Sequence, residues 1–351
     1  MTTHPSSADA PVRLGPRDRL GRPIRDLRIS LLDRCNYRCP YCMPETTFHA
    51  DYQFLQRNER LDHDEIVKLA GIAARLGVSK LRLTGGEPLL DKSVPALVRR
   101  LRDIPGIDDL ALTTNGTLLA NYAQALAEAG LDRVTVSLDS LDETLFRHMS
   151  GNRGDLPAVL DGIAAAEKVG LRPIKINTVV QRGINDHNVL DVLEHFRGTG
   201  HVVRLIEFMD VGNRNGWRLD QVVPSRDLRD RIDARWPLVP VGRDYVGEVA
   251  SRYRYRDGAG EVGFISSVTE PFCGDCSRAR LSADGVFYTC LFATSGLALR
   301  EPLRGGASDA ELEELLRACW LQRQDRYSEL RGQATVTEHP LRKVEMYRMG
   351  G

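Results

Sequence analysis

Six short apolar segments, separated by longer stretches of helical period, dominate the sequence between residues 27 and 209. This alternation predicts a parallel sheet with crossover helices. Six units favour an incomplete (β/α)6 barrel of the TIM type, and a doubly wound open sheet is the alternative. Both folds place a ligand at the carboxyl ends of the strands. The segments expected to be strands are 27–32, 80–85, 109–114, 133–139, 174–180 and 202–209, with helices expected at 61–77 and 121–130.

The β/α rhythm is lost after about residue 215. Two short β-like segments follow at 246–256 and 260–268, and a helical pattern occupies 308–323. We therefore expect a C-terminal α+β domain that caps the barrel. The predicted division is a flexible N-terminal extension at 1–20, a partial barrel at 21–215 and the capping domain at 216–351.

Charge and hydropathy exclude several classes of partner. Lys and Arg number 48, as do Asp and Glu, so the formal net charge is zero and no overall field attracts nucleic acid. No stretch has the apolar length of a membrane span or of a signal peptide. We expect a cytoplasmic protein that binds neither nucleic acid nor membrane. In a reducing compartment, closely spaced cysteines favour metal or redox chemistry over disulfides.

Three of the seven cysteines lie within eight residues, at Cys35, Cys39 and Cys42, directly after the first predicted strand. A structural zinc site needs a fourth ligand, for which His49 is the only candidate nearby. Three thiolates can instead hold a 4Fe-4S cluster whose fourth iron stays open to a cofactor or substrate. The alternative is that these cysteines are ordinary core residues that bind no metal.

A second set of three cysteines, Cys273, Cys276 and Cys290, again lacks an obvious fourth ligand. A zinc site completed by a distant histidine stays open at this point. The nearby Arg278 and Arg280 suggest an anionic ligand beside the metal, because guanidinium groups match phosphate and carboxylate oxygens. A solvated surface is the alternative for these arginines.

Basic residues within otherwise apolar predicted strands include Arg28, Arg82 and Lys175. A charge inside a buried parallel sheet is costly unless it is paired. These side chains are therefore unusual as core residues and suitable as contacts to an anion, although salt bridges inside the barrel would also explain them.

The motifs CNYRCPYCMP at 35–44 and TGGEP at 84–88 resemble those of the radical S-adenosylmethionine (radical SAM) superfamily. In that superfamily the open iron binds the methionine part of S-adenosylmethionine (SAM), which is cleaved to a 5′-deoxyadenosyl radical. The resemblance implies that the SAM site is lined by Tyr41, Gly86, Ser137 and Met209.

From about residue 17 to the last residue, the chain resembles the GTP 3′,8-cyclases of molybdenum cofactor (molybdopterin) biosynthesis. The resemblance rests on the two cysteine motifs, the R-x-R that follows the second, LTTNG, VSLDSLD, GINDHN, IEFMDVGNRNGW and the terminal MGG. It implies a lyase that converts GTP to (8S)-3′,8-cyclo-7,8-dihydroguanosine 5′-triphosphate, with two 4Fe-4S clusters and SAM. It also implies that the second cluster binds the guanine ring.

The same resemblance implies further roles for residues and partners. The implied GTP contacts are Arg28, Arg82, Thr113, Lys175, Arg278, Ala279 and Arg280, and the implied catalytic residues are Arg278, Arg280, Gly350 and Gly351. An external electron donor, a homodimer, and transfer of the product to cyclic pyranopterin monophosphate synthase are also implied. A radical SAM enzyme that modifies a peptide is the alternative function, and a zinc-stabilised scaffold and an electron carrier are more distant ones.

Overall fold

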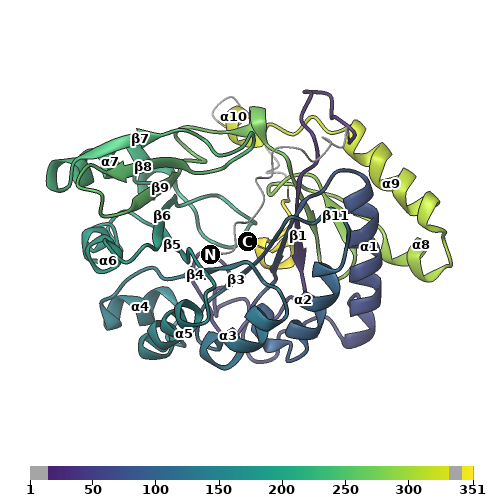
Figure 1. Ribbon diagram of the computed structural model, residues 1–351, viewed down its shortest axis with the longest axis horizontal. Coiled ribbons are helices and arrows are strands. Elements are labelled where there is room, and N and C mark those ends of the chain that lie inside the picture. The colour runs from purple at the N-terminus through teal and green to yellow at the C-terminus, as the bar shows by residue number, and fades with distance from the viewer. Residues whose placement is uncertain (1–14, 332–341, 351) are drawn as a thin grey trace, which may run out of the picture.

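The structure, a computed structural model, describes residues 15–331 and 342–350 and contains the six expected parallel strands (Figure 1). They pair in sequence order, each with the next, and all six predicted segments are confirmed, with ends that differ by at most two residues. Alternate residues of the strands, such as Leu81 and Leu83, are buried in the hydrophobic core, and the residues between them, such as Arg82, line the barrel interior. The strands are β1 (Asp26–Ser30), β2 (Lys80–Thr84), β3 (Asp109–Thr114), β4 (Arg133–Ser137), β5 (Lys175–Val180) and β6 (Val202–Glu207).

Helices cover the outer face of this curved sheet, as Figure 1 shows, so the fold is the incomplete barrel rather than the doubly wound sheet. Local sequence explains where several helices begin. The Asp62 carboxylate caps the first helix by accepting from the Glu65 N–H, and Asp155 caps the fifth by accepting from Ala158. These helices are α1 (His63–Arg75), α2 (Val94–Arg102), α3 (Leu119–Glu128), α4 (Glu143–Met149), α5 (Leu156–Lys168) and α6 (Val189–Phe196).

The C-terminal region extends the sheet at both of its open edges. Strand β10 (Arg278–Leu281) pairs in parallel with β1, and β9 (Glu261–Ile265) pairs in parallel with β6. The two β-like segments predicted from sequence are β8 and β9, whereas the attachment at the β1 edge was not predicted. The division at residues 20 and 215 stays a prediction. The outer strands are β7 (Leu238–Val241), β8 (Ser251–Tyr255), β11 (Val286–Tyr288) and β12 (Leu297–Ala298).

The remaining helices pack around the barrel and its C-terminal extension. The predicted C-terminal helix is α9 (Asp309–Leu321); its Trp320 is fully buried and donates from Nε1 to the Arg22 carbonyl at 3.1 Å. No helix in the described ranges has the length and apolar character needed to cross a bilayer. The other helices are α7 (Ser225–Arg235), α8 (Arg300–Arg304), α10 (Tyr327–Leu330) and α11 (Met346–Met349).

Candidate active site

A cavity of about 440 Å³ lies inside the barrel, and both cysteine sets line it. The first set lies on the loop that follows β1. The second set lies around the short 3-10 helix Cys273–Asp275 and just after β11. The two sets, which are more than 200 residues apart in sequence, therefore line one cavity. The six cysteines are Cys35, Cys39, Cys42, Cys273, Cys276 and Cys290, all of them free thiols.

The first set of cysteines is half-buried at the cavity wall, close to the carboxylates of Glu87 and Asp139. Burial, followed by the charge of Glu87, raises the pKa of Cys35 to about 12, and burial also raises the pKa values of Cys39 and Cys42. The Tyr37 N–H nevertheless points at the Cys35 sulfur, at 3.4 Å. Without a metal these thiols stay protonated at neutral pH. Metal binding must displace their protons, as thiolate coordination requires.

The TGGEP loop packs directly against the start of the first cysteine loop. The Gly86 N–H donates to the Leu32 carbonyl at 2.7 Å, and the Glu87 N–H donates to the Arg34 carbonyl at 2.9 Å. A Cβ on Gly86 would collide with the Arg34 carbonyl, so this close approach requires glycine. The two motifs thus form one compact unit at the carboxyl ends of β1 and β2.

The four residues implied to contact SAM all line the cavity: Tyr41, Gly86, Ser137 and Met209. A residue that sequence reasoning missed holds one of them in place. The Tyr41 hydroxyl donates to the Asp139 carboxylate at 2.6 Å, and burial raises the pKa of Asp139 to about 6. The glycine approach and the convergent side chains fit a cofactor at this end of the barrel.

Arginines close to the second set of cysteines give the thiols of this set different pKa values. Burial alone would keep Cys276 protonated, but the charges of Arg278 and then Arg323 outweigh it and lower the pKa of Cys276 to about 6. Burial and the charge of Asp325 instead raise the pKa of Cys290 to about 11. Cys276 is therefore prepared to act as a thiolate before any metal arrives.

The deepest row of the barrel carries alternating charges. Arg278, Asp26, Lys80 and Asp109 stand next to one another on β10, β1, β2 and β3. The Lys80 ammonium lies 3.7 Å from the Asp26 carboxylate and 3.1 Å from the Asp109 carboxylate. This row matches the salt-bridged interior considered as an alternative from sequence. It explains Lys80 without a ligand.

The next row of the same strands carries three like charges side by side. Arg280 pairs in register with Arg28 on β1, and Arg28 pairs in register with Arg82 on β2. Burial, followed by the neighbouring arginines, lowers the pKa of Arg28 well below its ordinary value. Like charges on adjacent strands destabilise a sheet. Within residues 15–331 and 342–350 no carboxylate forms an ion pair with these three arginines, so the row is suited to bind an anion.

The other implied GTP contacts continue around the cavity wall. Arg82 donates to the Thr113 hydroxyl at 3.0 Å, and Lys175 lines the cavity from the start of β5. Burial, followed by the charge of Arg204, lowers the pKa of Lys175 to about 7. Arg204 on β6 was missed, although it is a charged residue in an apolar strand like the three that were found. Its Nε donates to Asn177 at 2.9 Å.

Two predicted site residues need separate comment. Ala279 is 0% exposed and belongs to the hydrophobic core. Its side chain lies on the opposite face of β10 from those of Arg278 and Arg280, because successive residues of a strand point to opposite faces. The GTP contact predicted at Ala279 stays a prediction, and the backbone of this residue would have to make it. His49, the candidate fourth ligand, is exposed and forms an ion pair with Asp51 at 3.9 Å.

The C-terminal tail enters the barrel beside these arginines. Arg280 donates to the carbonyl oxygens of Met349 and Gly350, and a Cβ on Gly350 would collide with Thr84 at the end of β2. Gly350 has a φ of 72°, which also favours glycine. Gly351, the other predicted catalytic glycine, lies outside the described residues.

Within residues 15–331 and 342–350, no three His, Cys, Asp or Glu side chains converge as the ligands of a single metal ion do. The thiolates of a cubane cluster each bind a different iron, so they need not converge on one point. Two sets of three free cysteines that face one cavity fit a pair of such clusters.

Comparison with known proteins gives two family matches along the chain. Residues 29–196 match the family model of the radical SAM superfamily, and residues 201–329 match Molybdenum Cofactor Synthesis C. Among solved structures, Streptococcus suis SuiB bound to S-adenosylmethionine superimposes with a TM-score of 0.59 at 14% identity, covering 90% of this chain and 75% of SuiB. At that identity the likeness supports the fold alone.

Curated relatives are much more similar in sequence. The GTP 3′,8-cyclase of Xanthomonas campestris pv. campestris (strain 8004) is 56% identical over 95% of this chain and 97% of its own length. The enzymes of the same name from Acidothermus cellulolyticus and Staphylococcus aureus (strain bovine RF122 / ET3-1) are 50% and 46% identical, again over 95% of this chain and over 99% and 98% of their own lengths. The chain therefore belongs to the GTP 3′,8-cyclase family of the radical SAM superfamily.

Proposed function

We propose that this chain converts GTP to (8S)-3′,8-cyclo-7,8-dihydroguanosine 5′-triphosphate. The observation that carries the proposal is the row of three adjacent arginines, Arg280, Arg28 and Arg82, between the two cysteine sets in one cavity. A triphosphate supplies the negative charge that this row lacks. The identity to the curated cyclases supports GTP as the nucleotide.

In this proposal Cys35, Cys39 and Cys42 hold a 4Fe-4S cluster, and SAM binds beside it. The bound cluster and SAM together supply a carbon radical by one-electron cleavage of the sulfonium. The chain orients SAM through the Gly86 backbone and through Tyr41, whose hydroxyl Asp139 fixes. Ser137 and Met209 complete the walls and keep water away from the reacting atoms.

The second cysteine set and its arginines form the proposed substrate end. Cys273, Cys276 and Cys290 would hold a second 4Fe-4S cluster, whose free iron position takes the guanine ring. The phosphates would then lie against the arginine row and Lys175, which reach into the cavity from β1, β2, β5 and β10. This arrangement fixes the ribose between the two ends, and fixed proximity lowers the barrier to hydrogen transfer.

The tail completes the proposed site. Gly350 lies against Thr84, near the carboxyl end of β2 where SAM is proposed to bind, and its carbonyl accepts from Arg280 of the substrate end. We infer that Gly350 occupies a narrow space between cofactor and substrate, and Gly351 stays a predicted catalytic residue. A larger residue there would displace one of the two.

The product is an isomer of GTP, which defines a sharp test. Transfer of the C3′ hydrogen to the adenosyl fragment, bond formation from C3′ to C8, and addition of one electron and one proton to the base balance the reaction. Together with SAM cleavage it consumes two electrons and one proton, so an external donor is required.

The test uses protein reconstituted with iron and sulfide without oxygen, incubated with SAM, dithionite and GTP deuterated at C3′. Deuterium should appear in 5′-deoxyadenosine, together with a product of unchanged nucleotide mass apart from the isotope. GTP deuterated at C2′ is the substrate control and should give unlabelled 5′-deoxyadenosine. Cys276→Ala should lose product formation, whereas Cys319→Ala in α9 is the cysteine control and should keep it. Formation of 5′-deoxyadenosine with another nucleotide but not with GTP would refute the proposal.

We further propose that the chain acts as a homodimer and passes its product to cyclic pyranopterin monophosphate synthase. The match to Molybdenum Cofactor Synthesis C supports the place in that pathway. Sedimentation of the reconstituted protein tests the dimer, and conversion of the isolated product by the synthase tests the transfer.

A further inference from the structure

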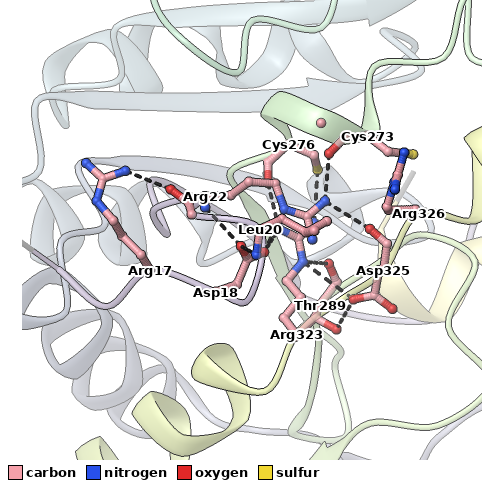
Figure 2. A network of polar contacts seen from close by, with 12 residues as sticks. Arg17, Asp18, Leu20, Arg22, Cys273, Cys276, Thr289, Arg323, Asp325 and Arg326 are labelled. Carbon is pink, nitrogen blue, oxygen red and sulfur yellow. Dashed lines mark hydrogen bonds and ion pairs between the residues drawn. The ribbon is translucent and has the colours of Figure 1, made fainter.

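Arg323, two residues beyond the end of α9, directs its whole guanidinium group at the second cysteine set (Figure 2). Its Nη2 lies 3.2 Å from the Cys276 sulfur, its Nη1 lies 2.6 Å from the Cys276 carbonyl, and its Nε donates to the Thr289 carbonyl at 3.0 Å. The side chain is 1% exposed. A deeply buried guanidinium group whose three nitrogens all donate hydrogen bonds is held in one orientation.

A buried carboxylate holds that orientation from behind. Asp18, whose side chain is 0% exposed, accepts from Arg323 Nη1 at 3.1 Å and from Arg22 Nε at 2.6 Å. Arg22 in turn donates to the Cys273 carbonyl at 2.6 Å and to the Asp325 carbonyl at 2.9 Å. Figure 2 shows these contacts as one network. Residues 15–22, expected to belong largely to a flexible extension, thus form part of the wall behind the second cysteine set.

The thiols of Cys276 and Cys290 accept hydrogen bonds from different numbers and kinds of donor. Cys276 accepts from two guanidinium groups, Arg278 at 3.3 Å and Arg323 at 3.2 Å. The Cys290 sulfur faces a single backbone N–H, that of Phe292 at 3.5 Å. Arg278 and Arg323 both line the cavity, but Arg278 is proposed to contact the substrate, whereas Arg323 is held by the Asp18 carboxylate and by the carbonyls of Cys276 and Thr289. Arg323 is therefore the donor whose contact to sulfur does not depend on the substrate.

We propose that Arg323, anchored by Asp18, is a positioning residue that fixes the Cys276 thiolate and raises the reduction potential of the second cluster. This inference rests on the proposed function, because it needs a cluster at that site. A charge-assisted hydrogen bond to a ligating sulfur withdraws electron density and favours the reduced cluster. It also keeps the cysteine oriented when the substrate leaves.

The test isolates the second cluster by substituting Cys35, Cys39 and Cys42 with alanine in the full chain. Iron and sulfide per chain are measured first, and the reduction potential is then determined by redox titration followed by electron paramagnetic resonance. Arg323→Gln should shift the potential to a more negative value. The control is Arg326→Gln, which removes a cation nearby that donates to Glu329 rather than to a cysteine. It should leave the potential unchanged within the scatter of repeated titrations.

The possible outcomes distinguish a failure of this inference from a failure of the proposed function on which it rests. If the alanine background binds no iron, the second cluster and this inference both fail. If it binds iron and Arg323→Gln leaves the potential at that of Arg326→Gln, this inference alone fails. If Arg323→Gln does not retain iron, Arg323→Lys and Asp18→Asn provide the comparison, because both keep a cation at position 323. Arg323→Lys replaces the guanidinium group by an ammonium group, and Asp18→Asn removes the carboxylate that holds Arg323 in place. Both should lower the potential, and an unchanged potential in both overturns the inference.

Discussion

We predict that Lys175, a proposed GTP contact, gives GTP binding a pH dependence whose size can be worked out from the structure. In the empty cavity, burial and then nearby guanidinium groups lower the pKa of Lys175 to about 7. A bound triphosphate places negative charge beside the ammonium group and raises that pKa again. Binding should therefore take up protons, about half a proton at pH 7 and about nine-tenths of a proton at pH 8.

The affinity follows the same equilibrium. Above the pKa of free Lys175, each pH unit should weaken GTP binding by up to about tenfold, or about 1.4 kcal/mol, until the pH reaches the raised pKa of the complex. Between pH 7.0 and 8.5 the dissociation constant should rise roughly 15-fold. This range lies above the ionisation of the terminal phosphate, which otherwise adds its own proton uptake.

The assay is anaerobic isothermal titration calorimetry of the reconstituted protein with GTP, in buffers of different ionisation enthalpy. Lys175→Met should bind more weakly at pH 7 and lose both the proton uptake and most of the pH dependence. Lys168→Met on the exposed end of α5 is the matched control and should behave as the parent. Equal proton uptake by the parent protein and Lys175→Met would refute the reasoning, because another group would then be responsible.

Three further substitutions test the cavity and its frame. Arg28→Met removes a buried charge among like charges, so the empty protein should be more stable by about 1–4 kcal/mol in thermal or denaturant unfolding. The same variant should bind GTP about 10–100-fold more weakly in calorimetry. Gly86→Ala forces a methyl group into the Arg34 carbonyl, so the first cluster should lose iron in analysis and SAM should bind poorly, with the helical circular dichroism retained. Trp320→Ala should lower the unfolding free energy by about 3–5 kcal/mol, since this fully buried side chain also donates to Arg22.

Much of the fold could be predicted from the sequence because each central strand is a short segment rich in β-forming apolar residues, set off by longer segments of helical period. The pairing of β10 with β1 could not be predicted. Its four residues, RARL, are half charged, and their partner lies about 250 residues away. Nothing local in such a short polar segment specifies a parallel partner, so only the assembled sheet reveals it.

The candidate site shows the same division between local and long-range information. Arg28, Arg82 and Lys175 could be predicted from the family resemblance, and their charge within otherwise apolar strands supports that prediction. The same rule applied to Lys80 and Arg204, yet it cannot tell an ion-paired residue from an unpaired one. Lys80 has two carboxylate neighbours, whereas Arg204 donates to the neutral Asn177. That distinction depends on strand register, which the hydrophobic pattern does not contain.

Register also explains how the barrel tolerates three adjacent arginines. At the usual strand spacing of about 4.8 Å and an effective dielectric constant of about 20, neighbouring unit charges repel by roughly 3 kcal/mol. The alternating row directly beneath supplies the carboxylates of Asp26 and Asp109, which offset part of this repulsion without binding the arginines directly.

The unrelieved repulsion has a functional consequence. Within residues 15–331 and 342–350 no carboxylate pairs with Arg280, Arg28 or Arg82, because those of the deepest row are engaged by Lys80, so a substrate anion that enters this row displaces none of the described carboxylates. Its binding energy therefore includes the relief of the repulsion as well as the new charge-assisted hydrogen bonds. A monophosphate can neutralise only part of the row, whereas a triphosphate can extend along it. The structure thus favours a nucleoside triphosphate through the arrangement of charge in the empty barrel, before any contact with the base is made.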